Sequence, residues 1–102
     1  MSRLAAMQRP PDGIFVGNNL MAVGALEALA ALNLAVPTDV RMVSFDEIPW
    51  AALIRPSLTT VAQPAYQIGV EAARLLLRRI RNPEAAIRQL VLQPELRIRE
   101  SA

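Results

Sequence analysis

Three polar residues in this sequence are placed where they could bind a small polar molecule. Each closely follows a short apolar run, and the three are Asn18, Asp46 and Gln63. Amide groups exchange hydrogen bonds readily with hydroxyl groups, and a carboxylate can accept from two adjacent hydroxyls in charge-assisted bonds. The same set is poorly suited to covalent chemistry. It therefore predicts reversible binding of a hydroxylated ligand.

Each of these residues also has a purely structural interpretation. Asn18 can cap the helix that follows it, because an Asn side chain at a helix start accepts from amides of the first turn. Asp46 can cap a short helix at residues 48–54, and Gln63 can be an exposed loop residue. The residue types alone leave these alternatives open.

The composition excludes several classes of site. The 102 residues include no cysteine and no histidine, so the chain cannot form a disulfide, a thiolate metal site or a Ser-His-Asp triad. We expect no catalytic residue, no metal site, no cofactor and no enzyme activity. All eleven basic residues are arginine, and the net charge is only +2, which does not indicate nucleic-acid binding. Four arginines on one predicted helix are expected to form a solvated face: Arg74, Arg78, Arg79 and Arg81.

The predicted elements would place the three polar residues at one edge of a sheet. Apolar and β-branched runs predict strands at residues 14–16, 40–45 and 58–61, and one or two more at 90–92 and 96–99. Periodicity predicts helices at residues 20–32, 48–54 and 66–81. This alternation is typical of an α/β fold with a parallel sheet and flanking helices. Ligands of such sheets bind at the carboxyl ends of the strands.

Four linked motifs resemble those of LacI/GalR-type transcriptional regulators. Residues 11–25, PDGIFVGNNLMAVGA, are similar to the family segment PDAIFxxNDxMAxGA. Residues 36–47 are similar to VPxDvsvvGFDD, residues 55–64 to xPxLTTVxQP, and the following helix to iGxxAxxlLlxxi. The resemblance implies part of a periplasmic-binding-protein-like (type I) subdomain. By position it also implies that Asn18, Asp46 and Gln63 line an effector cleft.

The resemblance further implies what the chain does and with which partners. Residues 1–102 correspond to a C-terminal fragment of a sugar-binding-protein-like effector-binding domain, with no DNA-binding headpiece of its own. We expect effector sensing and dimerisation within a repressor, where binding of a sugar or related small molecule alters operator affinity. Operator DNA would be bound only through the missing headpiece, and no membrane is involved. A fragment of a periplasmic sugar-binding protein of an ABC transporter is the alternative. No signal-peptide pattern follows Met1, so the expected compartment is the cytoplasm.

The resemblance also identifies two departures and an expected interface. Asn19 stands where the family usually has Asp, and Ser44 where it usually has Gly. Family subunits pair through the region matching these residues: Val23, Trp50, Leu53 and Ile54. Apolar clusters of this kind usually mark an interface when exposed, although burial in the chain's own core is an open alternative.

The helix at residues 66–81 is expected to lack its native partner. In the family, the chain crosses to the other subdomain just after the residue matching Gln63 and returns near Leu90. Burying the large side chains of its apolar stripe would contribute about 6–10 kcal/mol. We therefore expect another copy of the chain, or a fold-back onto the first three strands, to cover Ile68, Ala72, Leu75, Leu76 and Ile80.

Overall fold

The computed structural model describes residues 1–102, whose contacts divide into two compact units. Unit 1 comprises Met1–Ala62 and Leu96–Ala102, and unit 2 comprises Gln63–Glu95. The chain thus leaves unit 1 at Gln63, as the family resemblance implies. It re-enters unit 1 at Leu96 rather than near Leu90.

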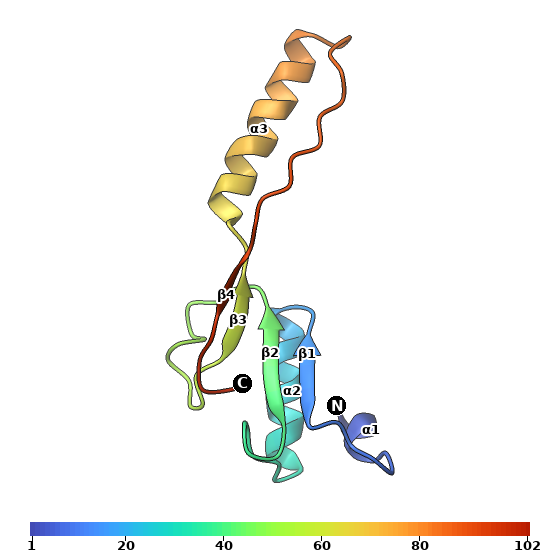
Figure 1. The fold of residues 1–102 in the computed structure, drawn as a ribbon, viewed down its shortest axis with the longest axis vertical. Helices are drawn as coiled ribbons and strands as arrows, with labels where there is room; N and C mark the ends of the chain where they lie inside the picture. The colour runs from blue at the N-terminus through green and yellow to red at the C-terminus, as the bar shows by residue number, and fades with distance from the viewer. The chain divides into compact units, whose positions relative to one another are not determined.

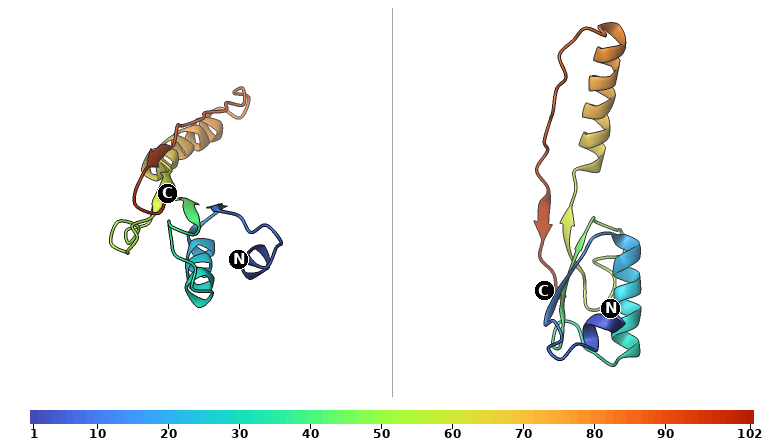
Figure 2. Two further views of the ribbon diagram at one scale, coloured as in Figure 1. Left: turned by 60° about the horizontal axis from the view of Figure 1, so that its bottom comes forward. Right: turned by 90° about the vertical axis from the view of Figure 1, so that its right-hand side faces the viewer.

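A four-stranded sheet forms the centre of unit 1. Its strands are β1 (Gly13–Val16), β2 (Arg41–Phe45), β3 (Thr59–Ala62) and β4 (Glu95–Arg97), in the order β1-β2-β3-β4 (Figure 1). The β1–β2 and β2–β3 pairs are parallel, as predicted. Figure 2 shows the arrow of β4 running opposite to that of β3. The α/β architecture is therefore confirmed, with a mixed sheet whose first three strands are parallel.

Helix α2 (Asn19–Ala31) packs against one face of this sheet (Figure 2). Glu27 is its only charged residue, and apolar side chains such as Leu29 are fully enclosed. The buried cluster between helix, sheet and loop consists of Val16, Ala22, Ala25, Met42, Ile48, Ala51 and Leu58. Because successive side chains of a strand alternate between faces, Phe15 and Val43 lie side by side on the other face, where Phe15 is exposed.

One predicted element is wrong. Residues 48–54 form turns and no helix, with bonds from the Ala51 amide to the Ile48 carbonyl (3.0 Å) and from the Leu53 amide to the Trp50 carbonyl (2.9 Å). Ile48 and Ala51 are buried in the core of unit 1, so tertiary packing rather than local periodicity determines the conformation here. Of the one or two closing strands expected, one forms, because residues 90–92 pair with no other strand. The short helix α1 (Ser2–Ala5) was not predicted.

Unit 2 consists of helix α3 (Ala65–Arg81) and the extended segment that follows it. No residue of α3 is buried. Part of its apolar stripe faces a shallow hollow of about 140 Å³, in which Ile68 and Leu75 lie with Leu90 and Leu92. Coverage of the stripe by another copy, or by a fold-back onto the first three strands, stays a prediction.

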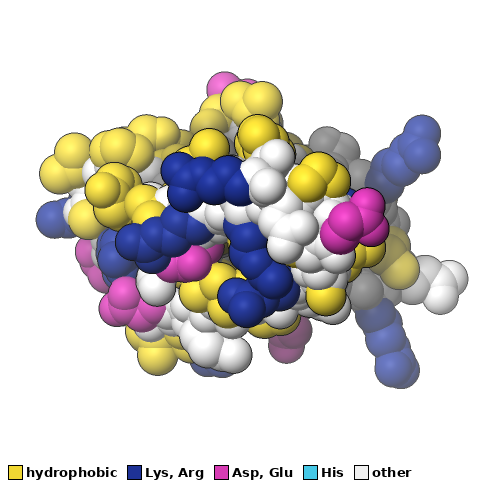
Figure 3. Space-filling model, turned by 90° about the horizontal axis from the view of Figure 1, so that it is seen from above, with side chains coloured by type: hydrophobic (Ala, Val, Ile, Leu, Met, Phe, Trp, Pro, Cys, Tyr) yellow, Lys and Arg dark blue, Asp and Glu magenta, His cyan; other side chains and the backbone are white.

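The arginines of α3 fit the predicted solvated face. Arg78, Arg79 and Arg81 lie in its last turn, and Arg74 makes an exposed ion pair with Glu71 at 2.8 Å. Figure 3 shows arginine and apolar side chains standing next to one another on the surface seen from above. Cations near a helix C-terminus interact favourably with the helix dipole, so their position has a structural explanation.

Candidate functional site

All three predicted site residues closely follow neighbouring strands of the sheet. Asp46 directly follows β2, and Asn18 follows β1 by two residues. The last residue of β1, Val16, is paired with Ser44 of β2, so both side chains belong to the same edge of the sheet. Gln63 directly follows β3, is exposed, and is the first residue of unit 2.

Asn18 caps helix α2. Its side-chain oxygen accepts from the Met21 amide at 2.9 Å, and its own backbone is extended. This confirms the capping interpretation without excluding a second role. The Asn18 side chain is exposed, and its amide nitrogen can donate to a ligand while the oxygen caps the helix.

Asp46 has an unusual backbone conformation. Its φ of 79° lies in the left-handed region, which non-glycine residues occupy rarely and which clusters at binding sites. The Asp46 amide donates to the Val61 carbonyl of β3 at 2.9 Å. Because residues 48–54 form no helix, Asp46 has no helix there to cap. The strand-end position is therefore the stronger explanation for this carboxylate.

A cluster of charged side chains surrounds the next residue, Glu47. Its carboxylate accepts from both terminal nitrogens of Arg99, at 3.1 Å to Oε1 and 3.0 Å to Oε2. Oε2 also accepts from Arg97 at 2.8 Å and from the Thr60 hydroxyl at 3.1 Å. Arg99 in turn donates to the Leu58 carbonyl at 2.8 Å. We call Glu47, Thr60, Arg97 and Arg99 the Glu47 cluster.

The Glu47 cluster holds its acid in the ionised form. The hydrogen bond from Arg99 is the largest cause that lowers the pKa of Glu47, from 4.5 to about 2, and Arg97 and Thr60 act in the same direction. Burial opposes them by raising the pKa. Fixed donors around an ionised group stabilise its charge. The sequence interpretation missed this cluster, because Glu47 and the two arginines are about 50 residues apart and no local spacing rule joins them.

The two departures from the family motif differ in their surroundings. The Asn19 side-chain oxygen is buried and has no hydrogen-bond partner, which is uncommon for a buried acceptor. Ser44 is fully buried in β2, and its hydroxyl donates to the Phe45 carbonyl at 3.2 Å. The Ser44 hydroxyl is thus satisfied internally, whereas the Asn19 oxygen leaves an unpaired acceptor beside Asn18.

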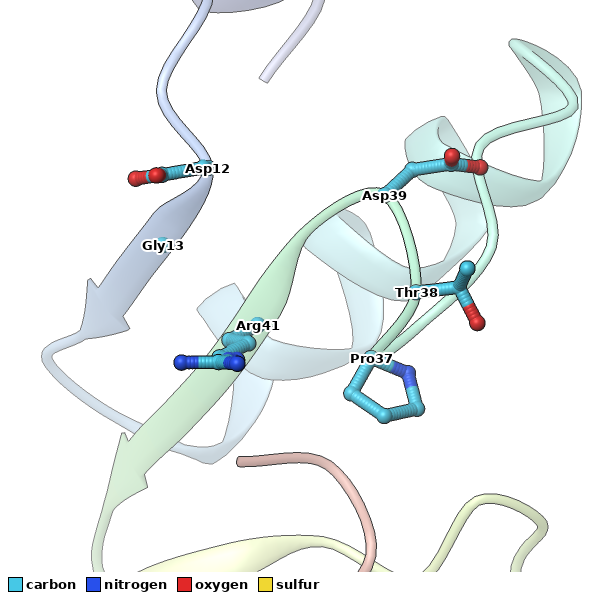
Figure 4. A pocket seen from close by; sticks show the side chains of 6 residues that line it. All are labelled: Asp12, Gly13, Pro37, Thr38, Asp39 and Arg41. Atoms are coloured by element: carbon cyan, nitrogen blue, oxygen red, sulfur yellow. The ribbon is translucent and has the colours of Figure 1, made fainter.

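None of the hollows described is lined by Asn18, Asp46 or Gln63. One of about 560 Å³ lies at the amino ends of β1 and β2, lined by Asp12, Gly13, Pro37, Thr38, Asp39 and Arg41 (Figure 4). Figure 4 shows the Asp12 and Asp39 side chains pointing away from each other, and Asp39 already accepts from the Ala35 amide at 2.7 Å. These groups converge on no common point. No group of three or more acidic side chains that could hold a metal ion is present.

The predicted interface residues differ in exposure. Leu53 is 77% exposed and Val23 39% exposed. Trp50 and Ile54 are half-buried and pack against the buried cluster of unit 1. Leu53 and Val23 are therefore accessible to a partner, whereas Trp50 and Ile54 also serve the chain's own core.

Comparison with known proteins decides between possible families for this fold. The periplasmic binding protein-like domain matches residues 1–102. The chain belongs to this family. A similar protein is the ribose operon repressor of Escherichia coli, which is 37% identical over 102 residues, covering 100% of this chain and 31% of the repressor. The chain thus spans about a third of that relative's length.

Solved structures of LacI-type regulators share the fold of this periplasmic binding protein-like chain. The transcriptional regulator LacI of Bacillus cereus subsp. cytotoxis is 32% identical with a TM-score of 0.93, over 99% of this chain and 36% of the other. A LacI family regulator of Enterococcus faecalis with bound ribose is 31% identical with a TM-score of 0.86, over 98% of this chain and 37% of the other. These matches confirm the predicted LacI-type resemblance. No helix of the chain is long and apolar enough to cross a membrane.

Proposed function

We propose that this chain is the effector-sensing and dimerisation segment of a LacI-type transcriptional repressor. It would form the C-terminal part of an effector-binding domain, and a separate headpiece in the longer protein would bind operator DNA. The observation that carries the proposal is the Asp46 carboxylate, which follows β2 in a left-handed conformation beside Asn18. In parallel sheets, ligands bind at this edge.

The chemistry of the site favours a sugar or a related hydroxylated effector. Asp46 can accept from two adjacent hydroxyls, while Asn18 and Gln63 supply amide groups. The Enterococcus faecalis relative was solved with ribose, which supports a sugar for this chain. Cysteine and histidine are absent, so the familiar nucleophile and base pairs of hydrolytic enzymes cannot form. We propose a sensor without enzyme activity, acting in the cytoplasm.

A transport role is the less supported alternative. Both functions use the same fold, but the similar proteins described above are transcriptional regulators. The coding sequence upstream of Met1 distinguishes the two. A helix-turn-helix segment in frame is expected for a repressor, whereas a secretory signal peptide would favour the transport protein.

Replacement of Asp46 tests the proposed site. In the longer regulator, Asp46→Ala is expected to weaken sugar binding by about 1.5–3 kcal/mol, the range for hydrogen bonds to a charged group. Asp46→Asn, which tolerates a positive φ, should lose affinity through the charge alone. Calorimetric titration with ribose and a panel of other sugars measures the effect.

The matched control is Asp12→Ala, which removes an exposed carboxylate before β1 and should leave sugar affinity unchanged. Equal affinities for the Asp46 variants and the unmodified protein would remove Asp46 from the site.

Replacement of Leu53 tests the proposed subunit interface. Placing a carboxylate there by Leu53→Asp should weaken self-association by about 10- to 100-fold, because one large apolar side chain contributes about 1.5–3 kcal/mol when buried. Light scattering across a concentration series reports the mass in solution. Ile87→Asp, at an equally exposed residue of unit 2, is the control. An unchanged dimer with Leu53→Asp would place the interface elsewhere.

A further inference from the structure

The backbone around Asp46 is held from two sides. On one side, the Asp46 amide donates to the Val61 carbonyl of β3. On the other, the side chain of the next residue, Glu47, accepts four hydrogen bonds from three residues of β3 and the C-terminal segment: Thr60, Arg97 and Arg99. The peptide group that joins Asp46 to Glu47 therefore lies between two fixed points.

Such anchoring is needed because the conformation of Asp46 is unfavourable in itself. A non-glycine residue at a positive φ persists only where surrounding structure determines it. After Glu47 the chain enters turns rather than a helix or strand. No regular series of backbone hydrogen bonds therefore fixes the direction of the chain at this point. Ile48 is buried, but apolar packing is non-directional. Hydrogen bonds to both oxygens of the Glu47 carboxylate, including the bidentate contact from Arg99, specify the orientation of this side chain as well as its position.

We propose that Glu47 is a positioning residue, which keeps Asp46 in its left-handed conformation and so presents the Asp46 carboxylate at the ligand-binding edge. The effect of Glu47 on the Asp46 conformation follows from the contacts within unit 1. The consequence for ligand binding rests on the proposed function. Glu47 itself need not touch the ligand, because both of its carboxylate oxygens are already engaged by the cluster.

The proposal is tested on the ligand-free chain by NMR, with Glu47→Gln as the main variant. At a positive φ the amide and Hα protons of one residue lie unusually close, so Asp46 should give a strong cross-peak between them in the unmodified chain. In Glu47→Gln this cross-peak should weaken to the level of neighbouring residues. The Asp46 amide, which is protected by Val61, should exchange about tenfold faster or more as its local structure loosens.

Matched variants separate positioning from general stability. Glu27→Gln makes the same chemical change at an exposed position of α2 and should alter neither signal. Glu47→Asp keeps a carboxylate and should restore most of the Asp46 cross-peak. If Glu47→Gln unfolds the chain, Arg99→Lys replaces it as the test variant. Arg99→Lys keeps the charge but loses the bidentate contact, and it is expected to weaken the Asp46 cross-peak and speed exchange of the Asp46 amide.

A folded Glu47→Gln or Arg99→Lys chain with an unchanged Asp46 cross-peak and unchanged exchange would overturn the proposal. Because no ligand is used, that outcome leaves the sugar titrations of Asp46 variants to decide the proposed function separately.

Discussion

Arg99→Met is expected to lower the free energy of unfolding of the chain by about 1.5–3 kcal/mol, the range for hydrogen bonds to a charged group, since it removes the bidentate partner of the half-buried Glu47 carboxylate. The Arg99 and Glu47 side chains are only 19% and 22% exposed. Loss of Arg99 removes both of its bonds to Glu47 and its bond to the Leu58 carbonyl. Arg97 and Thr60 would then be the remaining partners of Glu47 in the cluster.

Denaturant unfolding followed by circular dichroism measures the loss. Arg74→Met is the matched control, because it breaks an exposed ion pair with Glu71 and should cost about 0.5 kcal/mol or less. If the two variants were equally stable, the Glu47 cluster would contribute no more than a surface ion pair.

Acid is expected to destabilise the chain through the same cluster. The folded-state pKa of Glu47, about 2, lies below its ordinary value of 4.5, so the unfolded chain takes up the proton first as pH falls. The contribution of Glu47 to the free energy of unfolding is therefore complete above about pH 5 and is lost as pH falls toward 2. A shift of this size corresponds to at most about 3 kcal/mol.

The comparison with Glu47→Gln isolates this contribution from other acids. The variant should be less stable at neutral pH and should lose less stability between pH 5 and pH 2. Urea midpoints at several pH values give both curves. Parallel curves for the two proteins would contradict a lowered pKa at Glu47.

Local sequence patterns predicted most of the strands and helices because the formation of these elements depends largely on nearby residues. The predicted strand at residues 40–45 begins one residue before the observed β2, and the predicted helix at 20–32 is shifted by one residue from the observed α2. Their signals are an apolar run and a capping Asn, which depend on nearby residues alone. The helix predicted at 48–54 is absent because its apolar residues suggested helical periodicity, whereas packing of Ile48 and Ala51 into the core accompanies turns.

Local sequence patterns predicted the candidate site only in part. Strand-end position identified Asn18 and Asp46 without knowledge of their geometry, because parallel strands bring their carboxyl ends to one edge. The positive φ of Asp46 and the bonds between Glu47 and Arg99 depend on how the C-terminal segment returns beside β3. That pairing is long-range, and no pattern around residue 47 indicates it.

The operator affinity of the longer regulator, measured with and without sugars, is the most direct test of the proposed sensing function. Fluorescence anisotropy on operator DNA from its own promoter would be recorded with ribose and a panel of other sugars. We predict that at least one sugar changes the DNA affinity without being consumed, and that Asp46→Ala requires about 10- to 100-fold more of it for the same change. An operator affinity that no sugar alters, or that responds identically in both proteins, would contradict the account.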